Sequence, residues 1–154
     1  MIDKHILDYV DEKQSVYEKK FAKIDEGKIS WNWCAFLVPG AWFLYRKMYK
    51  YFVVLFCIGL VTGSLEFLVS GHASEIISYI TSIAISVCGG LFGDKLYYSR
   101  IKKLVAADDA SAASEEQRTE SVQKYGGVSP AAVVVLIMVA ILSFAIVTYS
   151  PFPL

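Results

Sequence analysis

Few residues of this chain have the type and spacing that catalysis or metal binding requires. Its three cysteines lie far apart inside apolar stretches, with no CxxC pair and no histidine close by in the sequence: Cys34, Cys57 and Cys88. We therefore expect neither a disulfide framework nor a zinc site. No GxSxG, HExxH, GxGxxG or P-loop motif occurs in the sequence. These observations predict no enzymatic activity, no cofactor and no bound metal.

Glu66 is the one charged residue in the apolar run 51–69. An acid inside a membrane-spanning segment is a candidate functional site, because burying its charge in hydrocarbon is costly. Glu66 lies near the far end of the run, so its carboxylate could instead extend to the lipid headgroups. Ser64 is two residues away but on another helix face, and the apolar run offers no base or nucleophile as a partner for Glu66. We keep Glu66 as a candidate intramembrane polar site without a catalytic role.

The stretch 31–50 combines aromatic and basic side chains around a Pro-Gly pair. Indole and phenol rings join an apolar body to a polar group, which favours the headgroup layer of a membrane. Lys and Arg stems can lie in the apolar layer while their charges reach water. We predict an interface for lipid or a protein partner at Trp31, Trp33, Trp42, Tyr45, Arg46, Lys47 and Tyr49. The alternative is that these rings form the core of a soluble domain.

Pro39 and Gly40 divide this stretch into two short arms, 31–38 and 41–49. Pro39 removes a backbone donor and Gly40 permits a sharp reversal, so one straight helix is not expected. A helical arm of this length extends about 12 Å, against about 30 Å of hydrocarbon. The pattern predicts a shallow re-entrant or interfacial helical hairpin over residues 31–50 that enters and leaves on one side.

A wider pattern extends from this stretch to the end of the second apolar run. It comprises Trp31-Asn32-Trp33, Ala35-Phe36, Pro39, Trp42, Tyr45-Arg46-Lys47-Met48-Tyr49, Gly93 and Leu96-Tyr97-Tyr98. In these residues the chain resembles a family of short bacterial membrane proteins known as domain of unknown function 2628. The run YRKMY is the most specific part, and the pattern covers roughly half of the chain. Asp94 stands where we expect a neutral Asn in the family. The resemblance implies a location in the membrane and an architecture, but no chemistry.

Composition also places the chain among membrane proteins. Hydrophobic residues make up 55% of the sequence, and its mean hydropathy is +0.45, which is more apolar than an ordinary soluble domain. About twenty apolar residues are enough to cross the hydrocarbon layer as a helix. Three runs meet this requirement, 51–69, 75–93 and 130–149. The sequence therefore predicts an all-α membrane protein with three transmembrane helices in addition to the hairpin.

Small residues recur at intervals of four on the first two predicted spans. We expect helix packing at Gly59, Gly63, Ser82, Ser86 and Gly90. Small residues at this spacing share a helix face and let two backbones approach closely. The two spans would then pack as an antiparallel pair through these faces. A contact between two copies of the chain is the competing use, and the sequence does not separate the two.

The remaining segments are more polar. Residues 1–30 carry apolar side chains at spacings near three and four, which predicts an amphipathic cytoplasmic helix, broken once. Its apolar stripe rests either on lipid headgroups or on the rest of the protein or a second copy. Residues 94–129 are predicted to extend the second span into water and then to form a linker or an exposed helix ending at Gly126-Gly127. Residues 150–154 form an external tail.

The positive charges give the predicted orientation. All fifteen Lys and Arg residues fall on one side of the membrane if the chain has three spans, nine before Tyr51 and six between the second and third spans. The positive-inside rule then places the N-terminus in the cytoplasm and the C-terminus outside, in the plasma (inner) membrane. His5 and His72 lie on opposite sides in this arrangement, so they cannot share a metal ion.

These features favour a small integral membrane protein that interacts rather than catalyses. We predict a non-enzymatic interaction, scaffold or accessory protein that engages membrane lipids or a partner through the hairpin. The partner would be a second copy or another membrane protein. A zero net charge gives no reason to expect a nucleic acid. The alternative is a subunit of a small oligomeric transporter or pore, suggested by the small-residue faces, Glu66 and serines on the second span.

Overall fold

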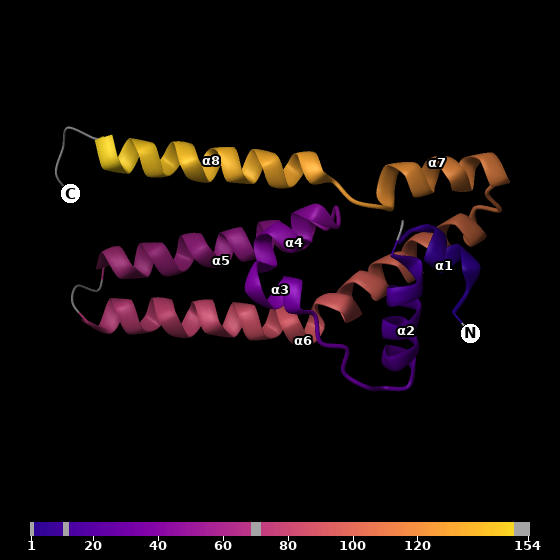
Figure 1. The fold of residues 1–154 in the computed structure, drawn as a ribbon, viewed down its shortest axis with the longest axis horizontal. Coiled ribbons are helices and arrows are strands. Elements are labelled where there is room, and N and C mark those ends of the chain that lie inside the picture. Colours follow the sequence, from indigo (N-terminus) through magenta and orange to yellow (C-terminus); the bar gives the residue numbers. More distant parts are fainter. Residues whose placement is uncertain (1, 11–12, 69–71, 150–154) are drawn as a thin grey trace.

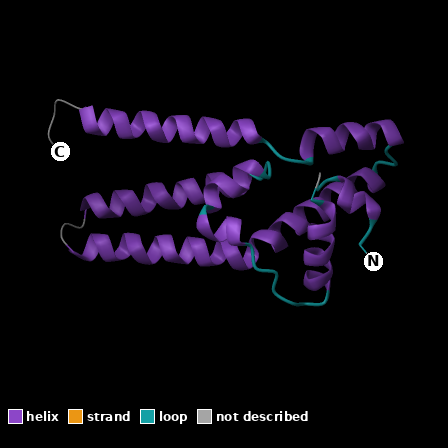
Figure 2. Cartoon of the chain, in the orientation of Figure 1, coloured by secondary structure: helices purple, strands orange, loops and turns teal. Residues whose placement is uncertain are grey.

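The computed structural model describes residues 2–10, 13–68 and 72–149, which form eight helices and no strand (Figures 1 and 2). The predicted all-α fold is confirmed for this part of the chain. The helices are α1 (Lys4–Asp8), α2 (Gln14–Asp25), α3 (Trp33–Leu37), α4 (Pro39–Tyr45), α5 (Tyr49–Leu68), α6 (His72–Ala110), α7 (Glu115–Tyr125) and α8 (Pro130–Tyr149). The predicted tail, 150–154, lies outside the described residues, as do the last residue of the first predicted span and the side chain of Glu66.

The molecule is elongated and divides into two parts (Figure 1). We call one part the stem, which comprises α5, residues 72–93 of α6, and α8. The other part is the head, which comprises α1, α2, residues 94–110 of α6, and α7. Helices α3 and α4 lie where the two parts meet, with α3 against α6 and α4 against α5 and α8. The long helix α6 runs through both parts and joins them.

The stem is apolar on its outside. Exposed side chains on α8 are Val134, Val135, Ile137, Met138, Val139, Ile141 and Leu142. Since successive helical residues are about 100° apart, these positions cover more than half of the helix surface. Two helical segments, within Glu75–Ala110 and within Glu115–Leu142, are long and apolar enough to cross a membrane, while the apolar stretch of α5, Tyr49–Leu65, is shorter. The stem thus leaves uncovered the type of side chain that the head buries.

The head has a core built from the N-terminal apolar stripe. Ile6, Val10, Tyr17 and Phe21 are buried there, together with side chains of α6: Tyr97, Tyr98, Ile101 and Val105. The Phe21 and Tyr98 rings stack with centroids 4.3 Å apart. Of the two uses predicted for the stripe, the one observed is packing on the rest of the chain. The predicted single break is present, since α1 and α2 are separate helices.

The segment that follows the second predicted span is mostly helical. α6 continues without interruption to Ala110, and α7 begins after a short turn. Ser114 starts α7 with a capping box, in which its hydroxyl accepts from the Gln117 amide and its own amide donates to the Gln117 side chain. Gly126 ends α7, so the predicted end at Gly126-Gly127 agrees with the structure. Of the linker and the exposed helix considered for this stretch, the helix is observed.

Candidate functional site at the junction of stem and head

The aromatic-basic stretch forms two short helices, α3 and α4, that meet at Val38. Asn32 caps α3, since its side-chain oxygen accepts from the Ala35 amide at 2.9 Å. Pro39 occupies the first turn of α4, where its missing amide hydrogen is not needed. Two short arms are therefore observed as predicted, with the break one residue before Pro39. We call residues 31–50 the hairpin.

Glycines of α6 allow α3 to lie directly on that helix. A Cβ at Gly89 would overlap the carbonyl oxygen of Ala35, and one at Gly90 would come within 2.9 Å of the Trp31 ring. The backbone amide of Asn32 also donates to the Gly90 carbonyl oxygen at 2.9 Å. The close approach that small residues permit is thus made between α6 and the hairpin.

This geometry corrects the predicted helix packing. Gly90 packs against the hairpin and not against α5, and a Cβ at Gly59 or Gly63 would meet nothing within 4 Å. Ser82 is exposed and Ser86 is half-buried. α5 and α6 do lie side by side as an antiparallel pair, but they do not approach through Gly59 and Gly63. The sequence showed which helix faces carry small residues, but it did not show which helix packs against each face.

Asp94 is the polar centre of the junction, and its side chain is fully buried. Its Oδ2 accepts from Lys20 Nζ at 2.8 Å and from Ser30 Oγ at 2.9 Å, and its Oδ1 accepts from Asn32 Nδ2 at 2.7 Å. One carboxylate therefore joins α2, the start of the hairpin and α6. Sequence reasoning noted Asp94 only as a departure from the family pattern and missed this role. The available signal was an acid directly after Gly93, on the helix face that packs.

Arg46 is buried among aromatic rings, with 4% of its surface exposed. Its guanidinium carbon lies 4.5 Å from the centre of the Tyr17 ring and 5.0 Å from that of Tyr97. One guanidinium nitrogen donates to the Val10 carbonyl oxygen at 3.2 Å. Burial raises the pKa of Tyr17 to about 12, and the positive charge of Arg46 opposes this rise. Rings and a carbonyl thus take the place of water around the cation.

Trp42 is also buried, with its ring edge-on to Tyr97. The prediction that Trp42 and Arg46 offer a surface to lipid or a partner is therefore wrong for the folded chain. The physical reason is that α6 packs against Trp42 through Gly93 and Tyr97, while the Tyr17 and Tyr97 rings enclose Arg46. Their substitution would disturb folding before it tested any interaction.

The other predicted interface residues are less covered. Trp33 is 65% exposed and Tyr49 is 50% exposed, whereas Trp31, Tyr45 and Lys47 are half-buried. Trp31 and Trp33 meet edge to face at 5.6 Å between ring centroids. Lys47 Nζ donates to the carbonyl oxygens of two α7 residues, Gln123 and Lys124. The exposed edge of the hairpin is therefore formed by Trp33, Leu37 and Val38.

Glu66 is not part of the junction. Its backbone lies in the last turns of α5, at the end of the stem away from the head, and its side chain is outside the described residues. The structure does not bring it together with the hairpin. Its role stays a prediction.

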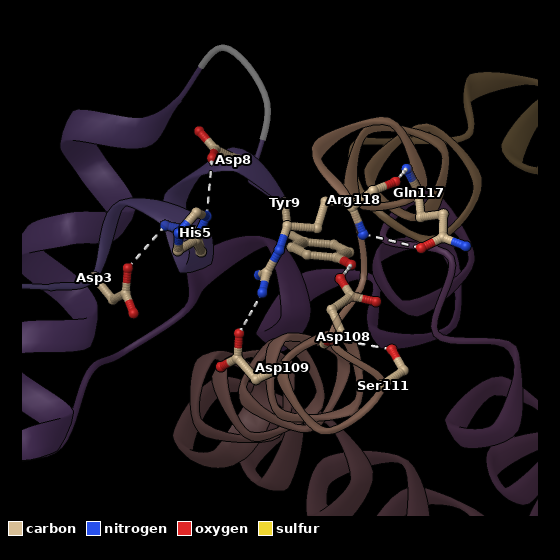
Figure 3. Close-up of polar contacts among 10 residues, drawn as sticks. Asp3, His5, Asp8, Tyr9, Asp108, Asp109, Ser111, Gln117 and Arg118 are labelled. Atoms are coloured by element: carbon tan, nitrogen blue, oxygen red, sulfur yellow. Dashed lines mark hydrogen bonds and ion pairs between the residues drawn. The ribbon is translucent and has the colours of Figure 1, made fainter.

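A second polar cluster, unforeseen from the sequence, closes the far end of the head (Figure 3). The Tyr9 hydroxyl donates to Asp108 Oδ2 at 2.7 Å and lies 2.7 Å from Ser121 Oγ. Beside it, Arg118 pairs with Asp109 at 2.6 Å. Burial raises the pKa of Tyr9 to about 12. The cluster joins the end of α1 to α6 and α7, and it therefore stabilises the head.

Comparison with known proteins gives one family. A family model described as "Protein of unknown function (DUF2628)" matches residues 8–103, more than half of the chain. The matched part contains α2, the hairpin, α5 and most of α6. Neither the curated proteins nor the solved structures contain a significant match. The family match confirms the resemblance drawn from the hairpin residues.

Proposed function

We propose, from the premise that this chain belongs to the DUF2628 family of proteins of unknown function, that it is a three-span membrane protein that acts by binding and not by catalysis. The observation that carries the proposal is the contrast between the two parts of the molecule. The head buries its apolar stripe, while the stem leaves large apolar side chains uncovered along three helices. Exposed apolar surface of this extent is unfavourable in water and favourable in lipid.

The length of the stem helices supports three crossings. α8 has 20 residues, which at 1.5 Å per residue gives about 30 Å, the thickness of the hydrocarbon layer. α5 has 20 residues, of which 18 follow the hairpin; they extend about 27 Å, close to that thickness. The first part of α6 lies beside α5 and returns over a similar distance (Figure 1). In this arrangement the hairpin lies at headgroup depth, on the side of the head.

The charge distribution supports the orientation. Every Lys and Arg lies in the head, in the hairpin or in the segments that connect their helices, and none lies in the turn between α5 and α6 or after Pro130. The positive-inside rule therefore favours a cytoplasmic head and an external C-terminus in a bacterial inner membrane. The binding partners proposed are membrane lipids and a second membrane protein or copy of the chain.

The exposed edge of the hairpin is the surface that we assign to this binding. Trp33, Leu37 and Val38 are all more than half exposed and lie beside the stem. An aromatic and aliphatic edge at headgroup depth can pack against lipid or against a transmembrane helix. The test is native purification in mild detergent, with mass spectrometry of what co-purifies, on the wild type and on Trp33→Ala plus Leu37→Ala.

We expect the double variant to lose a co-purifying partner that the wild type retains. A matched control is Tyr79→Ala, because Tyr79 is an exposed aromatic residue on the stem outside the hairpin. If both variants retain the same partners as the wild type, the hairpin is not the binding surface. Crosslinking in intact membranes would repeat the comparison without detergent.

One observation favours the second candidate, a subunit of an oligomeric transporter or pore. A Cβ at Gly59 or Gly63 would meet no atom of the described residues within 4 Å, and a helix face of this kind can accept a helix of a second copy. Solute or ion flux into proteoliposomes, with the wild type and with Glu66→Gln, tests this candidate. A flux equal to that of empty vesicles for both proteins would exclude it.

A further inference from the structure

A groove between α5 and α6 has the shape and chemistry of a lipid-chain site. Its volume is about 780 Å³, and its walls include Val54, Leu55 and Ile58 of α5 and Ile80, Ala84 and Ile85 of α6. The groove exists because α6 lines it with the small side chains of Thr81, Ala84 and Cys88, which cannot fill the space between the helices. A concave apolar site of this size is suited to an apolar ligand.

The head end of this groove leads to a basic cavity. Tyr51 lines both spaces. The second cavity, of about 430 Å³, is lined by Lys47, Lys50, Arg100 and Lys103, and its described lining contains no acidic residue. Lys95 also lines the head end of the groove itself. An apolar channel therefore ends in a cluster of cations that carboxylates do not neutralise.

Two of these cations are already oriented by α7. Lys47 Nζ donates to the Gln123 and Lys124 carbonyl oxygens, and Arg100 donates to the Tyr125 carbonyl oxygen at 3.0 Å. Lys50 and Lys103 are exposed and can turn toward an added anion. The positive charge is thus held at a fixed place by two residues and completed by two adaptable ones.

We propose that this chain binds one anionic phospholipid, with an acyl chain in the α5–α6 groove and the phosphate headgroup in the basic cavity. The proposal rests on the proposed function, because it places the groove at hydrocarbon depth and the cations at headgroup depth. Basic pockets between transmembrane helices on the cytoplasmic side are suited to anionic headgroups. A neutral lipid would leave the cations uncompensated, and a free phosphate would leave the groove empty.

The test is native mass spectrometry of the full chain in mild detergent, titrated with phosphatidylglycerol or with phosphatidylcholine. We expect one retained phosphatidylglycerol and little phosphatidylcholine. Lys50→Gln plus Lys103→Gln should weaken phosphatidylglycerol binding roughly tenfold or more, since each basic residue near an anionic headgroup contributes appreciably. The control is Lys19→Gln plus Lys23→Gln, which removes two exposed lysines of α2 and should leave binding unchanged.

A second pair of variants tests the groove without changing charge. Ala84→Trp should fill it and reduce phosphatidylglycerol binding, whereas Ile83→Trp should not, because Ile83 is exposed and does not line the groove. If Ala84→Trp lowers the unfolding temperature, Thr81→Leu is the milder filling variant. Two results would show a simple anion site and overturn the proposal. One is unchanged phosphatidylglycerol binding by both filling variants. The other is displacement of bound phosphatidylglycerol by inorganic phosphate at the same concentration as by added phosphatidylglycerol.

Loss of the lipid site would not refute three membrane spans. The binding assay uses purified protein, while the number of spans is measured by labelling in membranes. A protein with three spans and no preference for phosphatidylglycerol would contradict only the present inference.

Discussion

At the scale of single residues, Asp94 determines how the head is attached to the hairpin. Its carboxylate is fully buried and has three partners from separate parts of the chain: Lys20, Ser30 and Asn32. A buried carboxylate is tolerated only when hydrogen bonds and an opposite charge replace its hydration. Lys20 is partly exposed, so the pair keeps some contact with solvent.

Asp94→Ala should destabilise the protein by about 3 kcal/mol, because the change leaves an ammonium, an amide and a hydroxyl without their common acceptor. Thermal or denaturant unfolding of the protein in detergent measures the effect. The control is Asp109→Ala, which breaks the ion pair between Asp109 and Arg118. The Asp109 carboxylate is well exposed, so this change should lower the free energy of unfolding by less than about 1 kcal/mol. Equal effects of the two changes would contradict the role given to Asp94.

Tyr17 and Tyr9 should make the head sensitive to alkaline pH. Burial raises the pKa of each phenol to about 12, against about 10 in an unfolded chain. The folded state therefore holds these protons more tightly, and the stability they contribute is complete below about pH 10. It is lost as the pH rises from about 10 toward 12.

Replacing these tyrosines tests that sign. Unfolding free energy, followed by circular dichroism at several pH values, should fall less steeply between about pH 10 and 12 in Tyr17→Phe than in the wild type. The slope should change by up to about 1.4 kcal/mol per pH unit for one proton. Lysines also lose protons in this range, but they are common to both proteins. An unchanged slope in the variant would count against the raised pKa.

At the scale of elements, the contact of α3 with α6 fixes the hairpin. Gly89→Ala should force α3 away from α6, because the new methyl group would overlap the Ala35 carbonyl oxygen. We expect a loss of about 1–3 kcal/mol, as for other overpacked contacts. Gly59→Ala is the matched control, since its methyl group would meet nothing within 4 Å. The unfolding temperatures of the two variants give the comparison.

A larger effect of Gly59→Ala than of Gly89→Ala would contradict this account of the packing. It would also support the predicted role of Gly59 and Gly63 in close helix packing. A mass measurement on the Gly59 variant would then show whether a second copy of the chain uses that face.

The sequence was informative about the elements and less so about their neighbours. Pro39 and the length of the two arms were enough to predict two short helices in the hairpin. Spacing of small residues showed which faces of α6 permit close approach, but a five-residue helix such as α3 gave no periodic signal that would identify it as the neighbour. Asp94 was unpredictable in the same way, because its partners lie 62 to 74 residues away. For residues 94–129 the sequence left a linker and an exposed helix open, because composition fits both. The spacing of Ser114 and Gln117, which forms the observed capping box, was an unused signal for the helix.

At the scale of the whole molecule, the division into stem and head follows from where apolar residues cluster. Hydropathy alone predicted the apolar runs, because their length exceeds what a small soluble domain uses. It did not predict that the N-terminal stripe and α6 form one head core, since this depends on contacts such as Tyr17 with Tyr97. Burial of Trp42 and Arg46 has the same origin. Residue type favoured an interface, but in the fold α6 packs against Trp42 and the rings of Tyr17 and Tyr97 enclose Arg46.

Site-specific cysteine labelling in membrane vesicles tests the central claim, three spans with the head on one side, most directly. In a variant with Cys34, Cys57 and Cys88 replaced by Ser, single cysteines are introduced at Lys19, Ser111 and His72, which are exposed, and at Ser150, directly after the third predicted span. An impermeant maleimide added outside right-side-out vesicles should label His72→Cys and Ser150→Cys, and should label Lys19→Cys and Ser111→Cys only after permeabilisation. Labelling of Ser111→Cys from the same side as His72→Cys or Ser150→Cys would contradict the account.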